Sequence, residues 1–234
     1  MNRLQAIRQT GGLPRIGSHI LLLMLAMTGW TMPLHAEGQS GPIRIVAFGD
    51  SLTAGYMLRP ADAFPDQLQK ALKAKGHDVA ITNAGVSGDT SAAGLARLAW
   101  SVPEDTEAVI LELGANDALR GVDPELTRTS LERIVTALKA RKIEILLAGM
   151  SSPENWGADY SDAFNAIYRD MAKAHDLVFY PFFLEGVALK PELNLADGLH
   201  PTAKGIGVIV ERILPKTEEL IARVTSRRVL AQKP

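Results

Sequence analysis

An acid and a histidine stand three residues apart near the C-terminal end of the chain, in the stretch DGLHP (Asp197 to Pro201). The residue before a proline is pushed out of the helical conformation, so His200 is expected in extended backbone, with Pro201 as the first residue of the last helix. Asp197 can then fold back and accept a hydrogen bond from the imidazole, which fixes its tautomer and stabilises the imidazolium ion. Such a pair is one half of a nucleophilic catalytic unit, although a helix-capping turn with a surface histidine gives the same pattern.

The other half would be a nucleophile, and a serine is the leading candidate because the chain contains no cysteine. Ser51 follows Gly49 and Asp50 directly after an apolar run, and it opens a short helical turn whose dipole would favour negative charge. The chain has no G-x-S-x-G sequence, the usual nucleophile elbow of α/β-hydrolases. A serine at this place is also a common helix N-cap, so GDS alone is a weak signal.

Buried strands that alternate with helices must position these residues. This alternation is typical of a parallel sheet covered on both faces, and we predict one three-layer α/β/α domain around a mostly parallel five-stranded sheet. The strands are expected at 43–48, 79–82, 109–113, 143–148 and 177–180, and the helices at 64–75, 91–100, 125–141, 160–174 and 202–224.

Polar and glycine-rich stretches follow the carboxyl ends of the strands, which is where open parallel sheets bind their ligands. Ser51 and His200 are therefore expected at the same edge of the sheet, despite their separation in sequence. The stretches are GDSLTAGY (49–56), NAGVSGDTS (83–91), GANDALRG (114–121), GMSSPENWG (149–157) and, before the last helix, DGLHP.

The stretches GDSLTAGY, GVSGDTS, GANDALRG and DGLHP resemble, in order and spacing, the four sequence blocks of the SGNH, or GDSL, hydrolases. The resemblance covers essentially the whole chain after residue 36. Around Asn116 and at FFLEGVA (182–188) the sequence is similar to the bacterial periplasmic branch called thioesterase I, lysophospholipase or arylesterase. This resemblance implies a flavodoxin-like strand order and an esterase that acts on acyl esters and thioesters through a Ser–His–Asp triad.

The same resemblance implies roles for individual residues. Ser51 would be the nucleophile, His200 the base and Asp197 its orienting carboxylate. The oxyanion donors would be the backbone amides of Ser51 and Gly88 and the side chain of Asn116. These roles are physically reasonable, because a glycine allows close backbone approach and an asparagine is a neutral donor.

Neighbouring acids have structural interpretations. Asp50 and Asp117 flank the proposed site residues, and each is expected to bond nearby backbone amides and hold its loop. Asp89 is expected to cap the helix that follows it.

Apolar residues in the same loops are expected to line a groove for an acyl chain, with ordinary packing beneath the loops as the alternative. The candidates are Leu119, Met150, Pro153, Phe182 and Phe183. Two other functions stay open at this point: an SGNH-type carbohydrate deacetylase, which would favour acetyl groups, and a non-catalytic ligand-binding α/β module.

Composition excludes several classes of function. The formal net charge is -1 and no polybasic run stands out, so we expect no nucleic-acid partner. The absence of cysteine excludes disulfides and thiolate zinc sites. The chain has no H-E-x-x-H motif either, and we expect no metal and no other cofactor. The expected partner is a small-molecule acyl ester or thioester.

The first 36 residues have the pattern of a cleavable secretory signal peptide. Arg3, Arg8 and Arg15 carry positive charge without an acid, residues 20–27 (ILLLMLAM) are apolar, and Ala36 is the small residue before the cut. The apolar run is short against the roughly 20 residues of a membrane span, which favours cleavage over an anchor and leaves no span afterwards. We expect a flexible lead-in at 37–42, a single domain at 43–226, a C-terminal tail at 227–234, and a periplasmic or secreted protein.

The mature protein is expected to begin at Glu37. N-terminal sequencing of the exported chain should return Glu37 first, because signal peptidase cuts after a small residue in this context. The variant Ala36→Arg should keep the presequence attached. An intact Met1 in the membrane fraction of the unaltered protein would instead show an N-terminal anchor.

Overall fold

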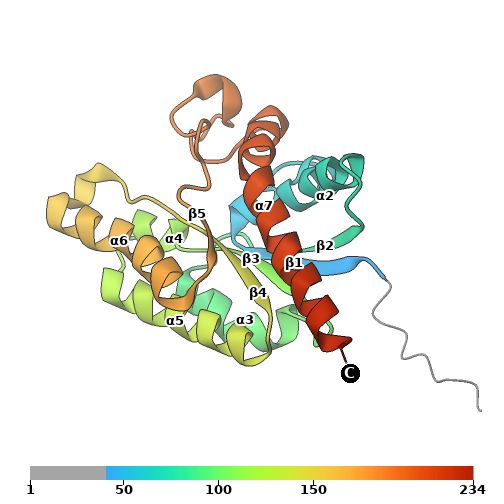
Figure 1. Cartoon of the computed structure of the whole chain (residues 1–234). Coiled ribbons are helices and arrows are strands. Elements are labelled where there is room, and N and C mark those ends of the chain that lie inside the picture. The colour runs from blue at the N-terminus through green and yellow to red at the C-terminus, as the bar shows by residue number, and fades with distance from the viewer. Residues whose placement is uncertain (1–40, 234) are drawn as a thin grey trace, which may run out of the picture. The chain divides into compact units, whose positions relative to one another are not determined.

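The computed structural model describes residues 41–233, so the predicted signal peptide and most of the lead-in lie outside the described residues. Five strands form one parallel sheet in the order β2-β1-β3-β4-β5 (Figure 1). This is the flavodoxin-like order, and the predicted fold class is confirmed. The strands are β1 (Ile43–Gly49), β2 (Val79–Gly85), β3 (Ala108–Glu112), β4 (Glu144–Ala148) and β5 (Val178–Tyr180).

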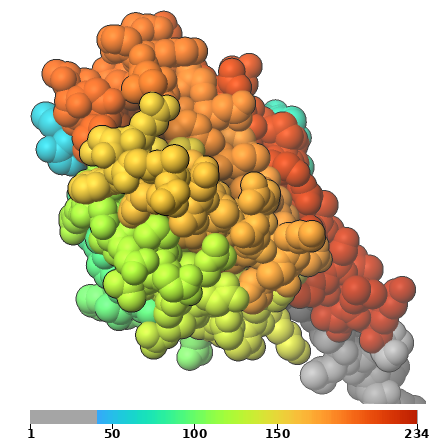
Figure 2. Space-filling model, turned by 90° about the vertical axis from the view of Figure 1, so that its left-hand side faces the viewer, coloured from blue at the N-terminus to red at the C-terminus, as the bar shows by residue number. Residues whose placement is uncertain are grey.

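Helices cover both faces of the sheet because its strands are apolar on both sides; every residue of the central strand β3 is buried. α2 and α7 pack together on one face, and α3, α5 and α6 pack on the other (Figure 1). Figure 2 shows the molecule from the left-hand side of Figure 1, where the surface of α6 lies beside that of α5. The long helices are α2 (Phe64–Ala74), α3 (Ser91–Ser101), α5 (Pro124–Ala140), α6 (Ala158–His175) and α7 (Ala203–Ala231).

The chain reverses its direction of winding between β1 and β3. From β1 it crosses to β2 at one edge, and it then returns to the other side of β1 to form β3. The crevice at such a switch point is the usual ligand site of an open parallel sheet. Two short helices start there, α1 (Ser51–Ala54) after β1 and α4 (Ala115–Leu119) after β3. The described part of the chain also contains the 3-10 helices η1 (Pro60–Asp62), η2 (Glu154–Trp156) and η3 (Pro191–Leu193).

The predicted C-terminal tail is wrong. α7 continues through the polar stretch TSRR to Ala231, five residues beyond the predicted domain end at 226. The Arg228 guanidinium bonds both carboxylate oxygens of Glu107, at 2.7 and 2.5 Å, and the carbonyl oxygen of Gly41 at 2.9 Å. Partners distant in sequence therefore stabilise the last turns of α7. Within residues 41–233, no helix is both long and apolar enough to cross a membrane.

Arg228→Ala is expected to lower the free energy of unfolding by about 1–2 kcal/mol at pH 7, because it leaves a buried carboxylate poorly paired. Burial raises the pKa of Glu107, but hydrogen bonds from Arg228 and the Arg44 amide bring that pKa below its usual value. A lowered carboxyl pKa contributes stability at neutral pH that disappears as the pH falls through the folded-state pKa.

Urea unfolding of Arg228→Ala and the unaltered protein across the acidic range checks this, and the difference should shrink as the pH falls. Arg169→Ala, which removes an exposed arginine beside Asp170, is the matched control. An equal loss of stability in the two variants would contradict the role given to the Arg228–Glu107 pair.

Candidate active site

Ser51 stands on the sharp turn that joins β1 to α1. Asp50, not Ser51, is the N-cap of this helix: its Oδ1 accepts the Leu52 N–H at 2.9 Å. The Ser51 hydroxyl is therefore not used as a cap, and its Oγ lies 2.9 Å from His200 Nε2. The alternative interpretation of Ser51 as the helix N-cap is wrong, because Asp50 has that role.

The buried side chain of Glu112, at the end of β3, holds this turn in place by hydrogen bonds. Its Oε2 accepts the Asp50 N–H at 3.3 Å and the Thr53 hydroxyl at 2.7 Å, so it binds residues on both sides of Ser51. Gly49 makes room for it, because a Cβ there would lie 2.5 Å from Glu112 Oε2 and 2.1 Å from Thr53 Oγ1. Sequence reasoning missed Glu112, although a lone acid in the apolar strand AVILE was a usable signal.

Glu112 is completely buried, and among the described residues its Oε1 has no hydrogen-bond partner. Burial, with the neighbouring Asp50 charge as a second cause, raises the pKa of Glu112 well above its usual value. An ionised carboxylate without full compensation is very costly at such a place. We therefore assign Glu112 as a neutral carboxylic acid.

His200 and Asp197 form the other half of the site. Asp197 Oδ1 accepts the backbone N–H groups of Leu199 and His200 at 2.9 and 3.0 Å, and its Oδ2 lies 2.7 Å from His200 Nδ1. The His200 and Leu199 amides, followed by the His200 side chain, lower the pKa of Asp197 to about 2. Asp197 is thus an anion at neutral pH and selects the tautomer with a proton on Nδ1. Nε2 is then free to accept the Ser51 hydroxyl proton.

Pro201 is not the first residue of the last helix, contrary to the prediction. It pairs with Asn194 in an isolated antiparallel bridge, and Thr202 is the N-cap of α7. The Leu195 N–H donates to the His200 carbonyl at 2.7 Å. His200 therefore lies in a loop whose two ends are held together by backbone pairing, and Pro201 belongs to that loop and not to α7.

The three predicted oxyanion donors lie at this edge of the sheet, Ser51 and Asn116 in the short helices α1 and α4 and Gly88 in the turn before α3. In the described part of the chain, the backbone N–H groups of Ser51 and Gly88 have no hydrogen-bond acceptor. Gly88 has φ +86°, a conformation that glycine adopts without strain. The Asn116 side-chain amide donates to Asp50 Oδ2 at 3.1 Å and to the Asp89 carbonyl at 3.0 Å. Asn116 therefore links the loop of Ser51 to the loop of Gly88.

Asp50 is held between these groups and is fully buried. Burial raises the pKa of Asp50 to about 6, although the Leu52 amide, the Asn116 amide and the charge of His200 oppose this. The carboxylate form accepts hydrogen bonds from both amides. Its structural interpretation, a residue that holds its loop, agrees with these contacts.

Two other acids fix the loops around the site. Asp117 accepts the backbone N–H and the hydroxyl of Ser91 at 2.8 and 2.6 Å, in line with the predicted loop-holding role. Asp89 does not cap α3, because Thr90 is the N-cap. Asp89 instead pairs with the buried Arg97 at 2.5 Å, and Arg97 bonds the Gly49 carbonyl at 2.8 Å.

The predicted acyl groove is partly wrong. Met150 and Phe183 are buried in the core, since each continues the apolar packing at the end of a strand. Pro153 and Phe182 are half-buried and Leu119 is exposed, so these three stay as candidates. The prediction omitted Tyr56, whose ring centroid lies 4.4 Å from that of His200.

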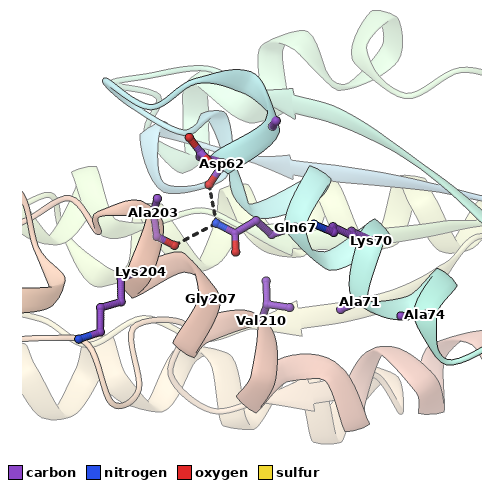
Figure 3. Close-up of a pocket in the computed structure, with 10 residues that line it drawn as sticks. Asp62, Gln67, Lys70, Ala71, Ala74, Ala203, Lys204, Gly207 and Val210 are labelled. Carbon is purple, nitrogen blue, oxygen red and sulfur yellow. Dashed lines mark hydrogen bonds between the residues drawn. The ribbon is translucent and has the colours of Figure 1, made fainter.

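A cavity of about 600 Å³ lies elsewhere, between α2 and the start of α7 (Figure 3). Half of its lining residues are alanine or glycine, and the Gln67 amide at its side donates to the carbonyls of Asp62 and Ala203 (Figure 3). Neither Ser51 nor His200 lines it. Within residues 41–233, no group of three or more His, Cys, Asp or Glu side chains is arranged to hold a metal ion.

Comparisons with known proteins agree with this geometry. Residues 47–206 match the GDSL-like lipase/acylhydrolase family. The arylesterase of Vibrio mimicus is 39% identical over 68% of this chain and 80% of its own length. Thioesterase 1/protease 1/lysophospholipase L1 of Escherichia coli (strain K12) is 38% identical over 76% of this chain and 84% of its own length.

A solved structure shows the same architecture. The psychrotrophic esterase EstA from Pseudoalteromonas sp., crystallised in a form inhibited by monoethylphosphonate, has a TM-score of 0.73 and 29% sequence identity. The similarity covers 77% of this chain and 99% of EstA. From its sequence match, its relatives and its sheet, the chain belongs to the GDSL-like lipase/acylhydrolase family and is an ester hydrolase.

Proposed function

We propose that this protein hydrolyses carboxylic esters and thioesters through an acyl-enzyme on Ser51, with acyl, aryl and lysophospholipid esters and acyl thioesters as its substrate classes. The observation that carries the mechanism is the continuous contact from Ser51 Oγ to His200 Nε2, at 2.9 Å, and from His200 Nδ1 to Asp197 Oδ2, at 2.7 Å. The substrate classes rest on the relatives named as an arylesterase and as a thioesterase and lysophospholipase.

Acylation begins when Ser51 Oγ attacks the acyl carbonyl carbon and transfers its proton to His200 Nε2. Asp197 stays ionised and stabilises the imidazolium that results. The tetrahedral intermediate then collapses as the bond to the alcohol or thiol breaks, and Nε2 returns the proton to that leaving group. In deacylation a water molecule attacks the acyl carbon and gives a proton to Nε2. The bond between the acyl carbon and Ser51 Oγ then breaks, Nε2 returns the proton to Oγ, and the acid is released.

The negative charge of the tetrahedral intermediate would be received by the Ser51 and Gly88 amides, which have no other acceptor in the described chain. Asn116 would supply the third hydrogen bond. Both acceptors of its amide, Asp50 Oδ2 and the Asp89 carbonyl, hold the Nδ2 group in place, so a developing oxyanion must share these protons. Such rigid preorganisation is the usual source of oxyanion stabilisation.

The signal-peptide pattern of the first 36 residues supports a further proposal, that hydrolysis takes place in the periplasm or outside the cell. The export prediction given above tests it.

Ser51→Ala is expected to abolish ester hydrolysis, because no other group can form the acyl-enzyme. A serine-directed phosphonate should add one adduct to the unaltered protein, on the peptide that contains Ser51, as read by mass spectrometry. Ser226→Ala, on the exposed side of α7, is the control and should keep full activity and labelling. Labelling of any other serine would refute the triad.

Asn116→Ala is expected to lower kcat by about 10²–10³ and to change KM little, because an oxyanion donor acts only in the transition state. Steady-state kinetics with a p-nitrophenyl ester measure both constants. Gln232→Ala, which removes an exposed amide side chain at the C-terminal end of α7, should behave like the unaltered protein. A raised KM with an unchanged kcat would place Asn116 against the ground state of the substrate instead.

Hydrolysis of p-nitrophenyl esters of increasing acyl length separates the three functions considered from the sequence. Activity should rise from acetyl toward medium-length esters, by at most about fourfold per added CH₂, since burying one contributes roughly 0.8 kcal/mol. Best activity on acetyl esters with none on octanoyl esters would favour the carbohydrate deacetylase. No hydrolysis of any ester would favour the non-catalytic module.

A further inference from the structure

Tyr56 lies on the same turn as Ser51. The Ser51 carbonyl accepts the N–H groups of both Gly55 and Tyr56 at 3.1 Å, and the Leu58 N–H donates to the Gly55 carbonyl at 2.9 Å. Gly55 is required here, because it has φ +80° and a Cβ would lie 2.5 Å from the Ala63 Cβ. The backbone therefore holds Tyr56 in a fixed relation to Ser51.

The Tyr56 ring lies against the His200 ring. Their centroids are 4.4 Å apart and their planes are inclined by 36°, so the contact is a tilted stack. Both ring nitrogens of His200 are already used at its edges, Nδ1 by Asp197 and Nε2 by Ser51. Tyr56 thus contacts a surface of the imidazole that neither partner reaches. A cation within about 6 Å of an aromatic centroid is attracted by the ring.

Other charges around His200 are already accounted for. The Asp197 carboxylate lies at Nδ1, and the buried Asp50 interacts with His200 through its charge. Both acids favour the imidazolium form of His200, Asp197 by contact with the edge of the ring and Asp50 through its charge from farther away. The Tyr56 ring adds a neutral attraction, and with 42% of the residue exposed it leaves room for substrate beside it.

We propose that Tyr56 is a positioning residue that stabilises the imidazolium form of His200 through its ring, and so lowers the barrier of the two steps in which His200 accepts a proton, from Ser51 and from water. The inference rests on the proposed function, in which His200 is the general base. A cation–π contact at a partly exposed site has a modest effect, equivalent to about two- to fivefold in rate. The phenolic hydroxyl has no part in it.

The test compares Tyr56→Leu, which keeps an apolar side chain but removes the ring, with Tyr56→Phe, which keeps the ring. The pH dependence of kcat/KM is measured for each variant with one p-nitrophenyl ester. Phosphonate titration counts the active sites, and thermal unfolding confirms that each variant is folded. Trp100→Leu, which removes an exposed aromatic ring near the C-terminal end of α3, is the matched control.

Tyr56→Leu should lower the plateau of kcat/KM about two- to fivefold. It should also move the acidic limb of the profile to lower pH by roughly 0.4–0.7 of a unit, because loss of the ring disfavours the protonated base. Tyr56→Phe and Trp100→Leu should retain the unaltered plateau and limb.

Three outcomes would overturn the inference: an unchanged profile in Tyr56→Leu, a shift of its limb to higher pH, which would mean that the ring only excludes water, or equal damage in Tyr56→Phe. Failure of the proposed function looks different. In that case Ser51→Ala and His200→Ala would themselves keep their activity, whatever Tyr56 does.

Discussion

The site depends on one buried carboxyl group placed beneath a turn. Glu112 ends the central strand β3, and its Oε2 binds the backbone before Ser51 and the Thr53 side chain after it. Because β3 is buried on both faces, the acid cannot be hydrated, and its proton is retained instead. A neutral group that accepts hydrogen bonds holds the turn without a second negative charge beside Asp50. The serine is therefore positioned by the central strand of the sheet, which is buried throughout.

From this turn, polar contacts extend across the switch point between β1 and β3. Asn116 binds Asp50 and the Asp89 carbonyl, Asp89 pairs with Arg97, and Arg97 returns to the Gly49 carbonyl. Because Gly49 directly precedes Asp50, these contacts form a closed ring. Its members come from the segments that follow three strands and from α3, so the segments that carry Ser51, Gly88 and Asn116 are linked to one another. Such support keeps donors aimed at a charge that exists only briefly.

The sequence predicted the fold and family well where each signal was local. Apolar runs marked all five strands, and the polar stretches after them marked the edge that holds Ser51, Asn116 and His200. Predictions failed where the outcome depended on distant partners. Apolar loop residues such as Met150 and Phe183 cannot be told from core residues by type alone. The sequence at the C-terminal end of α7 does not indicate that Arg228 will pair with Glu107.

Errors at the site had a similar cause. Asp89 precedes a helix and is a residue type that often serves as an N-cap. Its carboxylate instead pairs with Arg97, and Thr90 is the N-cap. Proline is common as a first helical residue, but Pro201 instead pairs with Asn194 in an isolated β-bridge. Each residue suits two local structures, and only tertiary packing decides between them. The residue roles in catalysis stay predictions until the variants described above are measured.

Ser51 and His200 are 149 residues apart in the chain, and α7 begins only three residues after the histidine. During synthesis the serine leaves the ribosome long before the histidine does. The serine then lacks its base, and it gains one only when the last helix packs against α2 and the loop before it closes. In the proposed mechanism an incomplete or unfolded chain therefore carries a serine without a base, so that ester hydrolysis at this site requires the completed fold.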